Sequence, residues 1–325
     1  MTQLMTRIFF ALAALGLSLP LAPARAQRDS APVKSALQLL HVQGRVHMLV
    51  GAGANITIQL GDAAVVLVDS GLPEMSPQVL AAIRSLSQKP IEFIINTSAD
   101  DDHTGGNHNL SQAGHFISGM VGETPGASIV SQIAVLNRMS GGKGAPPELW
   151  PTDTYDTDRW ALFNDEAITL EHPRAAHTDG DTSVFFRRSD VIATGDVFTP
   201  DRYPMIDLAK GGSINGEIDA LNRLIELMVP RAEEEGGTYV IPGHGRVCDR
   251  NAVTNYRDMV TIIRDRIADS VKKGLTLDQV KASRPTLDYD GIYGSDSGPW
   301  TTAMFIDAVY KDLNARARKP LEKPE

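Results

Sequence analysis

Carboxylate and imidazole side chains that could bind a metal ion stand at a few glycine-containing junctions of this 325-residue sequence. The first junction follows the apolar run Ile91–Ile95 and reads Asp100-Asp101-Asp102-His103 before Thr-Gly-Gly-Asn. Buried strands of α/β proteins read as short apolar runs, and polar clusters at their carboxyl ends are where such proteins place chemistry. An aspartate beside a histidine at such an end supplies half of a metal site, because Zn²⁺ accepts both donors.

Three later junctions repeat this pattern. His177 lies in AAHTDGDTSVFF, Asp196 in VIATGDVF and His244 in YVIPGHG, each beside an apolar, strand-prone run and beside glycine or another small residue. One such motif alone is weak, because an acidic residue in a short polar stretch is commonly a turn or a helix cap. Four of them in one chain predict a metal centre built from distant strand ends.

The order of these motifs makes the sequence resemble the metallo-β-lactamase superfamily from about Leu40 to Arg246. The resemblance implies an α/β fold, a four-layer αββα sandwich in which two sheets pack face to face with helices outside. It also implies zinc as the cofactor and a shared ligand set. One ion would be held by Asp102, His103 and His244, with Asp196 bridging to a second ion that His177 helps to bind. Asp69, which ends the run AAVVLVDSG, would orient these ligands from behind.

The sequence departs from the family at its first junction, where the family pattern is His-x-His-x-Asp-His. Ser98 and Asp100 stand in place of the two leading histidines, so the resemblance leaves one metal site complete and the other altered. We therefore expect one zinc ion, with two ions as the alternative. Manganese or iron is an alternative metal, because replacing an imidazole by a carboxylate favours such ions.

Three interpretations of Asp100 stay open. Residues 98, 100 and 102 alternate in an extended segment and can face one cleft, with Ser98 supporting the ligands. Asp100 could act as a general base beside a single metal, with Asp102 as the second catalytic carboxylate. It could instead bind a second metal together with His177. In the third interpretation the site has lost turnover and only binds a ligand.

The reaction implied by the resemblance is hydrolysis of a small ester, thioester, lactone or lactam by metal-bound hydroxide. Asp196 at the fourth motif resembles the thioesterase and lactonase members of the family more than its β-lactamases. The fold alone does not choose the substrate. The alternative from a different class is a non-catalytic accessory protein that binds a metal or ligand at a decayed site.

The amino terminus indicates export to the periplasm or beyond the cell. Arg7, an apolar stretch of 14 residues from Ile8 to Leu21, and Ala24-Arg25-Ala26 are typical of a signal peptide, residues 1–26, cleaved after Ala26. Cleavage removes two arginines, so the formal charge falls from −9 to −11. An acidic mature chain argues against nucleic acid or a membrane as partner and leaves a small-molecule substrate. The sequence makes no prediction of the oligomeric state.

The elements that would position the ligands follow from the apolar patterning. Glycine-punctuated strands from Gln38 to Gly71 predict an antiparallel meander, and a helix fits Ser76 to Ser87. FFRRSDVIATGD reads as a hairpin, and Ile218–Met228 as an amphipathic helix. We expect a metallo-β-lactamase-like domain at 27–250 and helices packed on it at 251–325. Those helices are predicted at Asn251–Lys273, Leu277–Lys281 and Trp300–Ala315.

Two loops are candidate substrate walls. The stretch 141–160 reads as an ordered but irregular flap, because Trp150, Tyr155 and Trp160 need something to pack against. A second loop follows Asp196 and carries Tyr203 and Gly211-Gly212-Ser213.

Overall fold

The computed structural model describes residues 37–118, 122–142, 144–232 and 236–318. The predicted signal peptide, residues 1–26, lies outside this part of the chain. All of these described residues fall in one compact unit. Within the described ranges, the structure contains no helix with the length and apolar character that crossing a membrane requires.

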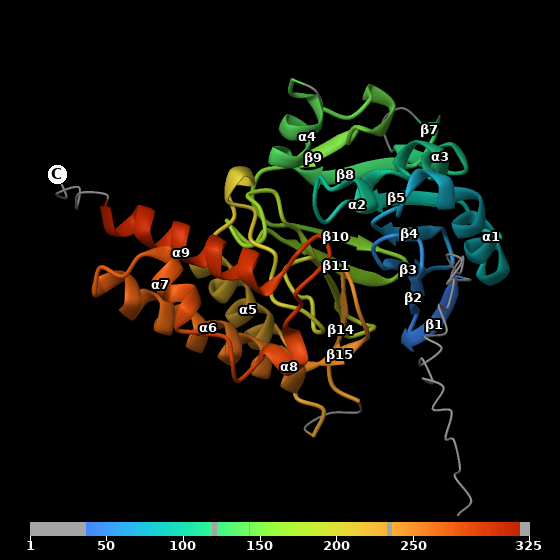
Figure 1. Cartoon of the computed structure of the whole chain (residues 1–325). Coiled ribbons are helices and arrows are strands. Elements are labelled where there is room, and N and C mark those ends of the chain that lie inside the picture. The colour runs from blue at the N-terminus through green and yellow to red at the C-terminus, as the bar shows by residue number, and fades with distance from the viewer. Residues whose placement is uncertain (1–36, 119–121, 143, 233–235, 319–325) are drawn as a thin grey trace, which may run out of the picture. The chain divides into compact units, whose positions relative to one another are not determined.

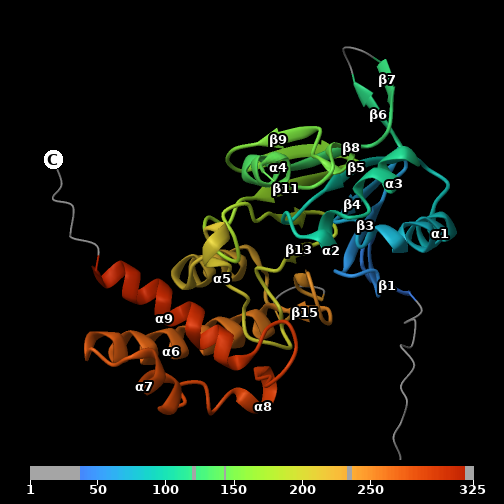
Figure 2. The same ribbon diagram turned by 45° about the horizontal axis from the view of Figure 1, so that its top comes forward.

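The first sheet has seven strands in the order β1-β2-β3-β4-β5-β8-β9 (Figure 1). Its first four strands form the predicted antiparallel meander, and the last three continue it in parallel with β4. The bounds are β1 Gln38–Gln43, β2 Val46–Val50, β3 Ile56–Leu60, β4 Val65–Val68, β5 Ile91–Ile95, β8 Ser128–Gln132 and β9 Asp153–Tyr155. Strands β6 (His115–Ser118) and β7 (Gly122–Pro125) pair separately as a two-stranded ribbon, which stands away from the large sheet in Figure 2.

The second sheet has six strands in the order β10-β11-β12-β13-β14-β15. The predicted hairpin is β12 with β13, and β13 runs parallel to β14. The bounds are β10 Arg159–Phe163, β11 Glu166–Glu171, β12 Ser183–Phe186, β13 Val191–Gly195, β14 Tyr239–Pro242 and β15 Cys248–Asp249.

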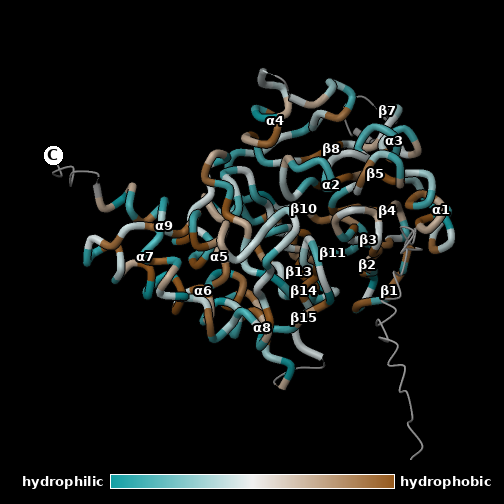
Figure 3. The backbone as a smooth tube through the Cα atoms, in the orientation of Figure 1, coloured by the Kyte–Doolittle hydropathy of each residue, from teal (hydrophilic) through white to brown (hydrophobic). Residues whose placement is uncertain are grey.

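Three buried apolar clusters define the layers. One lies between the sheets and joins residues such as Val66 and Val130 to Val184 and Ile241. The second covers the outer face of the first sheet with helices α1 (Ser76–Leu86) and α3 (Asn107–Gln112). The third covers the outer face of the second sheet with α5 (Ile214–Leu227), α6 (Arg250–Lys272) and α9 (Thr302–Arg318). The predicted αββα sandwich with a C-terminal helical part is confirmed, and Figure 3 shows hydrophobic stretches along its strands and along α5 and α6.

The remaining helices are short: α2 Asp101–Thr104, α4 Ile133–Ser140, α7 Leu277–Ala282 and α8 Asp290–Tyr293. Helix α5 begins four residues before its predicted start. The Ser213 hydroxyl accepts a hydrogen bond from the backbone N–H of Gly216 at 3.0 Å and caps the helix. Gly216 interrupts the apolar pattern in the first turn, so the pattern alone does not predict that the helix begins at Ile214.

The stretch 141–160 is more regular than predicted. It contains a 3-10 turn (Pro147–Leu149), strand β9 and the beginning of β10. Tyr155 is buried between the sheets, and its hydroxyl hydrogen-bonds the Thr182 hydroxyl at 2.7 Å. Trp160 is 75 % exposed on the edge strand β10. The segment is ordered and Tyr155 is packed, as predicted. The prediction that it is irregular and that Trp160 packs is wrong, because strand pairing with β8 orders the segment and Trp160 is exposed.

Candidate metal centre

The candidate ligands lie at the carboxyl ends of strands from both sheets. Asp69 follows β4, and Asp102 and His103 lie in α2 beyond β5, which runs parallel to β4. Asp196 follows β13, and His244 lies two residues beyond β14, again a parallel pair. The carboxyl ends of parallel strands meet at one edge of a sheet, and this brings residues far apart in sequence to one place.

Two imidazoles and two carboxylates converge at this edge. His103 Nε2 lies 3.9 Å from Asp102 Oδ1 and 3.7 Å from Asp196 Oδ2. His244 Nε2 lies 3.2 Å from Asp102 Oδ2 and 3.6 Å from Asp196 Oδ1. The donor atoms of Asp102, His103 and His244 lie within 4.8 Å of one another, and Asp196 lies beside them. Donors bound at about 2.0 Å to one tetrahedral zinc ion lie about 3.3 Å apart, so a contraction of the cluster would seat a cation there.

The hydrogen bonds around His103 aim it at this centre. Its Nδ1 lies 2.8 Å from Asp69 Oδ2, and an ionised carboxylate only accepts, so Nδ1 carries a proton; in the neutral ring that a metal would bind, Nε2 then presents its lone pair. Thr97 fixes Asp69 in turn through its backbone N–H at 2.8 Å and its hydroxyl at 2.7 Å. Both His103 Nε2 and Asp196 Oδ1 are buried without a hydrogen-bond partner. Buried polar atoms are normally paired, so the four side chains fit a bound cation.

The charges of the cluster are strongly coupled. Burial lowers the pKa of His103, but Asp69 and Asp196 outweigh burial and raise that pKa well above its usual range. Burial raises the pKa of Asp196, but His103, His244 and His177 together lower it far below its usual range. The pKa of Asp102 is likewise lowered, because His244 and His103 outweigh burial. Without a metal, a proton on His103 balances the neighbouring carboxylates.

A second group consists of Asp100, His177 and Asp196, whose donor atoms lie within 4.8 Å of one another. His177 Nε2 lies 3.6 Å from Asp100 Oδ2, and its Nδ1 lies 3.6 Å from Asp181 Oδ1. Burial lowers the pKa of His177, but Asp181, Asp196 and Asp100 raise it above its usual value. The other oxygen of Asp100 accepts a hydrogen bond from the Lys210 ammonium at 2.5 Å. This group therefore already holds a cationic side chain.

Ser98 is buried beside this second group. Its hydroxyl accepts a hydrogen bond from the backbone N–H of Asp100 at 3.2 Å. Ser98 thus stabilises the turn that begins α2.

The three aromatic residues predicted as substrate walls lie away from the cluster. Tyr203 is 1 % exposed and stacks on Phe305 at 4.8 Å between ring centroids, so it belongs to the core under α9. Buried Tyr155 likewise offers no ring to a cleft. Half-buried Trp150 donates its indole N–H to the Ala145 carbonyl at 2.8 Å and lines a different groove. These three side chains are therefore not walls of the cluster, because packing and hydrogen bonds hold them elsewhere.

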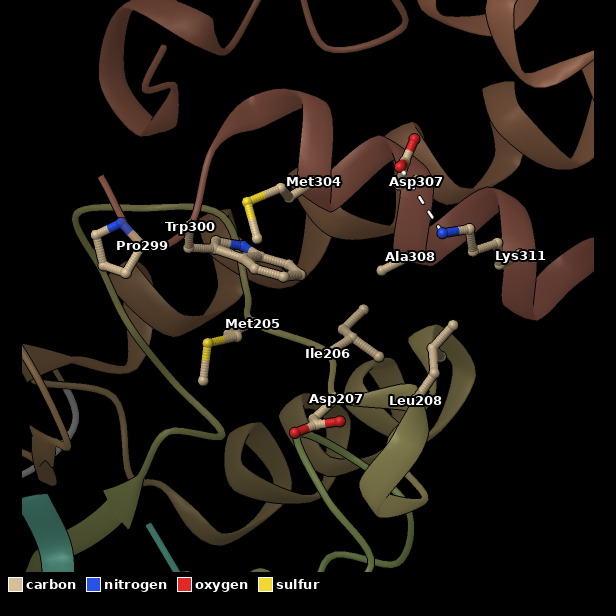
Figure 4. Close-up of a pocket in the computed structure, with 10 residues that line it drawn as sticks. All are labelled: Met205, Ile206, Asp207, Leu208, Pro299, Trp300, Met304, Asp307, Ala308 and Lys311. Atoms are coloured by element: carbon tan, nitrogen blue, oxygen red, sulfur yellow. Dashed lines mark ion pairs between the residues drawn. The ribbon is translucent and has the colours of Figure 1, made fainter. Parts of the chain in front are cut away.

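A hollow of about 510 Å³ lies directly beside the second group. It is bounded by Asp100 and Lys210 on one side and by the segment Gly144–Leu149 on the other. The long loop therefore does supply a wall, through residues that carried no signal. A separate apolar groove of about 410 Å³ runs between Met205–Leu208 and α9, where Trp300 covers it (Figure 4).

Several residues of the site were not predicted. Lys210 and Asp181 adjoin the second group, and Thr97 supports Asp69. Arg202 Nη2 lies 3.9 Å from Asp196 Oδ1. For Arg202 and Lys210, the sequence gives one signal: both lie in the loop after Asp196 that is predicted as a substrate wall from its glycines and Tyr203.

The comparisons with known proteins agree with this geometry. The family model described as the metallo-beta-lactamase superfamily matches residues 50–244, so the chain belongs to this superfamily. The comparison with curated proteins found no match.

Two solved structures show the same fold. A metallo-beta-lactamase from Pontibacter korlensis has a TM-score of 0.55 at 16 % identity, and the match covers 69 % of this chain and 99 % of that one. A stereoselective inverting sec-alkylsulfatase from Pseudomonas sp. has a TM-score of 0.61 at 15 % identity, with 88 % of this chain and 52 % of that chain covered. At such identities the similarity defines the fold alone. Superfamily membership and the two candidate metal groups make this a metal-dependent hydrolase-like fold.

Proposed function

We propose that this protein is an exported hydrolase of a small ester, thioester, lactone or lactam that works with one zinc ion held by Asp102, His103, Asp196 and His244. The observation that carries the proposal is the buried, unpartnered Nε2 of His103, which faces two carboxylates and a second imidazole. Buried polar atoms normally have a hydrogen-bond partner, and a cation bound to the lone pair of this nitrogen would explain why it has none. A zinc ion bound there supplies Lewis acidity, which polarises a carbonyl group and lowers the pKa of water.

The four side chains differ in their exposure to solvent. His103 and Asp196 are almost fully buried, and Asp69 holds His103 from behind. The side chains of Asp102 and His244 are 33 % and 29 % exposed. Substrate would therefore approach from the side of Asp102 and His244, where a carboxylate oxygen can also accept a proton.

A second candidate, ligand binding without turnover, is favoured by one observation. Asp100, the expected general base, is ion-paired with Lys210. The Asp100 oxygen that accepts the Lys210 hydrogen bond at 2.5 Å is not open to a substrate or a water molecule.

A panel of chromogenic lactam, lactone, ester and thioester substrates tests the proposal. We expect turnover by the zinc-loaded protein and its loss in His244→Ala, with His108→Ala as the matched control because His108 is exposed and outside both groups. Zinc bound at the cluster without turnover of any substrate would favour the second candidate. Equal activity of His244→Ala and the control would overturn the ligand assignment.

Export is part of the same proposal and is supported by the amino-terminal sequence. Expression in a bacterial host should give a periplasmic protein that begins at Gln27, as determined by amino-terminal sequencing. A cytoplasmic product that retains residues 1–26 would contradict it.

A further inference from the structure

Hydrogen bonds fix the backbone at Lys210, whose side chain adjoins the second group. The Asp207 carboxylate accepts hydrogen bonds from the backbone N–H groups of Ala209 and Lys210, both at 3.1 Å, and this fixes the 3-10 turn that carries Lys210. The Lys210 carbonyl accepts from the Asp179 N–H at 2.9 Å and from Arg138 at 3.1 Å. The backbone under the ammonium group is therefore held on both sides.

The ammonium group lies where it neutralises the second group. Lys210 Nζ is 2.5 Å from Asp100 Oδ1 and 3.3 Å from Asp207 Oδ2. The opposite oxygen of Asp100 faces His177. One carboxylate thus lies between a fixed positive charge and the imidazole that would share a metal with it.

The donors left for a second metal ion are few. Asp196 is common to both groups, since its oxygens also face His103 and His244. Asp100 has one oxygen engaged by Lys210, and Ser98 is engaged with the backbone of Asp100. Only His177 is wholly available. A second divalent ion would have few negative ligands and a positive charge next to one of them.

We propose that the Lys210 ammonium takes the place of a second metal ion beside Asp100 and His177, so that the protein binds one divalent cation. This inference rests on the proposed metal at Asp102, His103, Asp196 and His244. Lys210 is a positioning residue here: it satisfies Asp100 and keeps a second cation out by charge. A unit charge a few ångströms from a bound cation, at an effective dielectric constant of about 20, changes affinity by roughly 100-fold or more.

The test is a count of bound ions. Wild type, Lys210→Met and Lys210→Arg are dialysed against ZnCl₂, and the metal content is measured by plasma mass spectrometry with calorimetric titration of the same samples. We expect one ion in wild type and in Lys210→Arg, and two ions in Lys210→Met, the second with an affinity at least about 100-fold higher than in wild type. Lys311→Met is the control, because Lys311 is exposed and pairs with Asp307 instead. The control should bind one ion.

A double variant identifies the second ligand set. Lys210→Met combined with Asp100→Ala should return to one ion, because it removes the carboxylate that the ammonium had neutralised. If Lys210→Met folds poorly, as judged by circular dichroism, Lys210→Gln serves in its place.

The inference and the proposed function fail in different ways. One ion in both wild type and Lys210→Met would overturn the inference and leave the proposed function standing. Two ions in wild type would overturn the inference together with the one-ion part of the proposed function. No ion in any of these proteins would overturn both. An ion that appears only when Lys210 is replaced would also overturn both, because both require one ion in wild type.

Discussion

Asp69 holds an unusual backbone conformation for its role. Its φ is +64°, a region that non-glycine residues adopt at a cost of about 1 kcal/mol or more unless their surroundings enforce it. The surroundings that enforce it are Thr97 and His103. Thr97 donates two hydrogen bonds to the Asp69 carboxylate, and His103 donates one from its Nδ1–H. The strain therefore serves to place one carboxylate behind one imidazole. Groups behind a metal ligand typically contribute 10–100-fold to metal affinity.

We predict that Asp69→Asn lowers zinc affinity by about 10–100-fold while the fold persists. Asparagine fits the positive φ, but its amide nitrogen would face the N–H of His103 and remove the acceptor that sets the tautomer. Competition with a chromophoric chelator measures the affinity. Asp62→Asn is the matched control, since the Asp62 side chain is 86 % exposed. An unchanged affinity in Asp69→Asn would show that His103 does not depend on this hydrogen bond.

At the scale of elements, the sequence predicts strands better than contacts. The run Ile91–Ile95 is β5 without a shift, and Ser76–Ser87 is α1 within one residue, because apolar runs bounded by glycine and proline determine such elements locally. The ligand set also follows from local motifs at strand ends. The ion pair of Lys210 with Asp100 joins positions 110 residues apart, and no local pattern signals it.

The errors have the same origin. The sequence predicts that Trp160 packs inward, but it lies on the exposed face of an edge strand. Tyr203 was expected at a cleft, but the C-terminal helices cover it. An aromatic residue in a loop carries no information about which face of a distant element it will meet.

Helix α5 carries a buried carboxyl group whose ionisation is opposed by its surroundings. Glu217 is fully buried, both of its carboxyl oxygens lack hydrogen-bond partners, and its pKa is raised well above 4.5 by burial and then by Asp181 and Asp196. The folded protein thus favours the protonated acid. Its contribution to stability is complete below pH 4.5 and is lost as pH rises toward the raised pKa.

We predict that Glu217→Gln gains stability over wild type as pH rises above 4.5, by up to about 1.4 kcal/mol per pH unit until the raised pKa is reached. Below pH 4.5 wild type and Glu217→Gln should have the same free energy of unfolding. Urea unfolding of metal-free protein across the pH range measures the difference. Asp219→Asn is the control, because Asp219 is on the exposed face of the same helix. A difference that does not change with pH would contradict the buried-acid assignment.

At the scale of the whole molecule, the cluster lies where the two sheets of the sandwich meet. Asp102 and His103 come from the first sheet, and Asp196 and His244 come from the second. A cation bound by all four would therefore cross-link the two halves of the sandwich. Because such a ligand set does not exist in the unfolded chain, the binding free energy adds to the stability of the fold.

We predict that zinc at 100 times its dissociation constant raises the free energy of unfolding by about 2.7 kcal/mol and the melting temperature by roughly 5 °C. A chelator should reverse the shift. His244→Ala should lose most of it, because this variant removes a ligand of the second sheet, whereas His108→Ala should keep it. Calorimetric melting of the three proteins with and without zinc measures the effect. If His244→Ala shifted as far as wild type, zinc would be stabilising the protein from somewhere other than the junction of the two sheets.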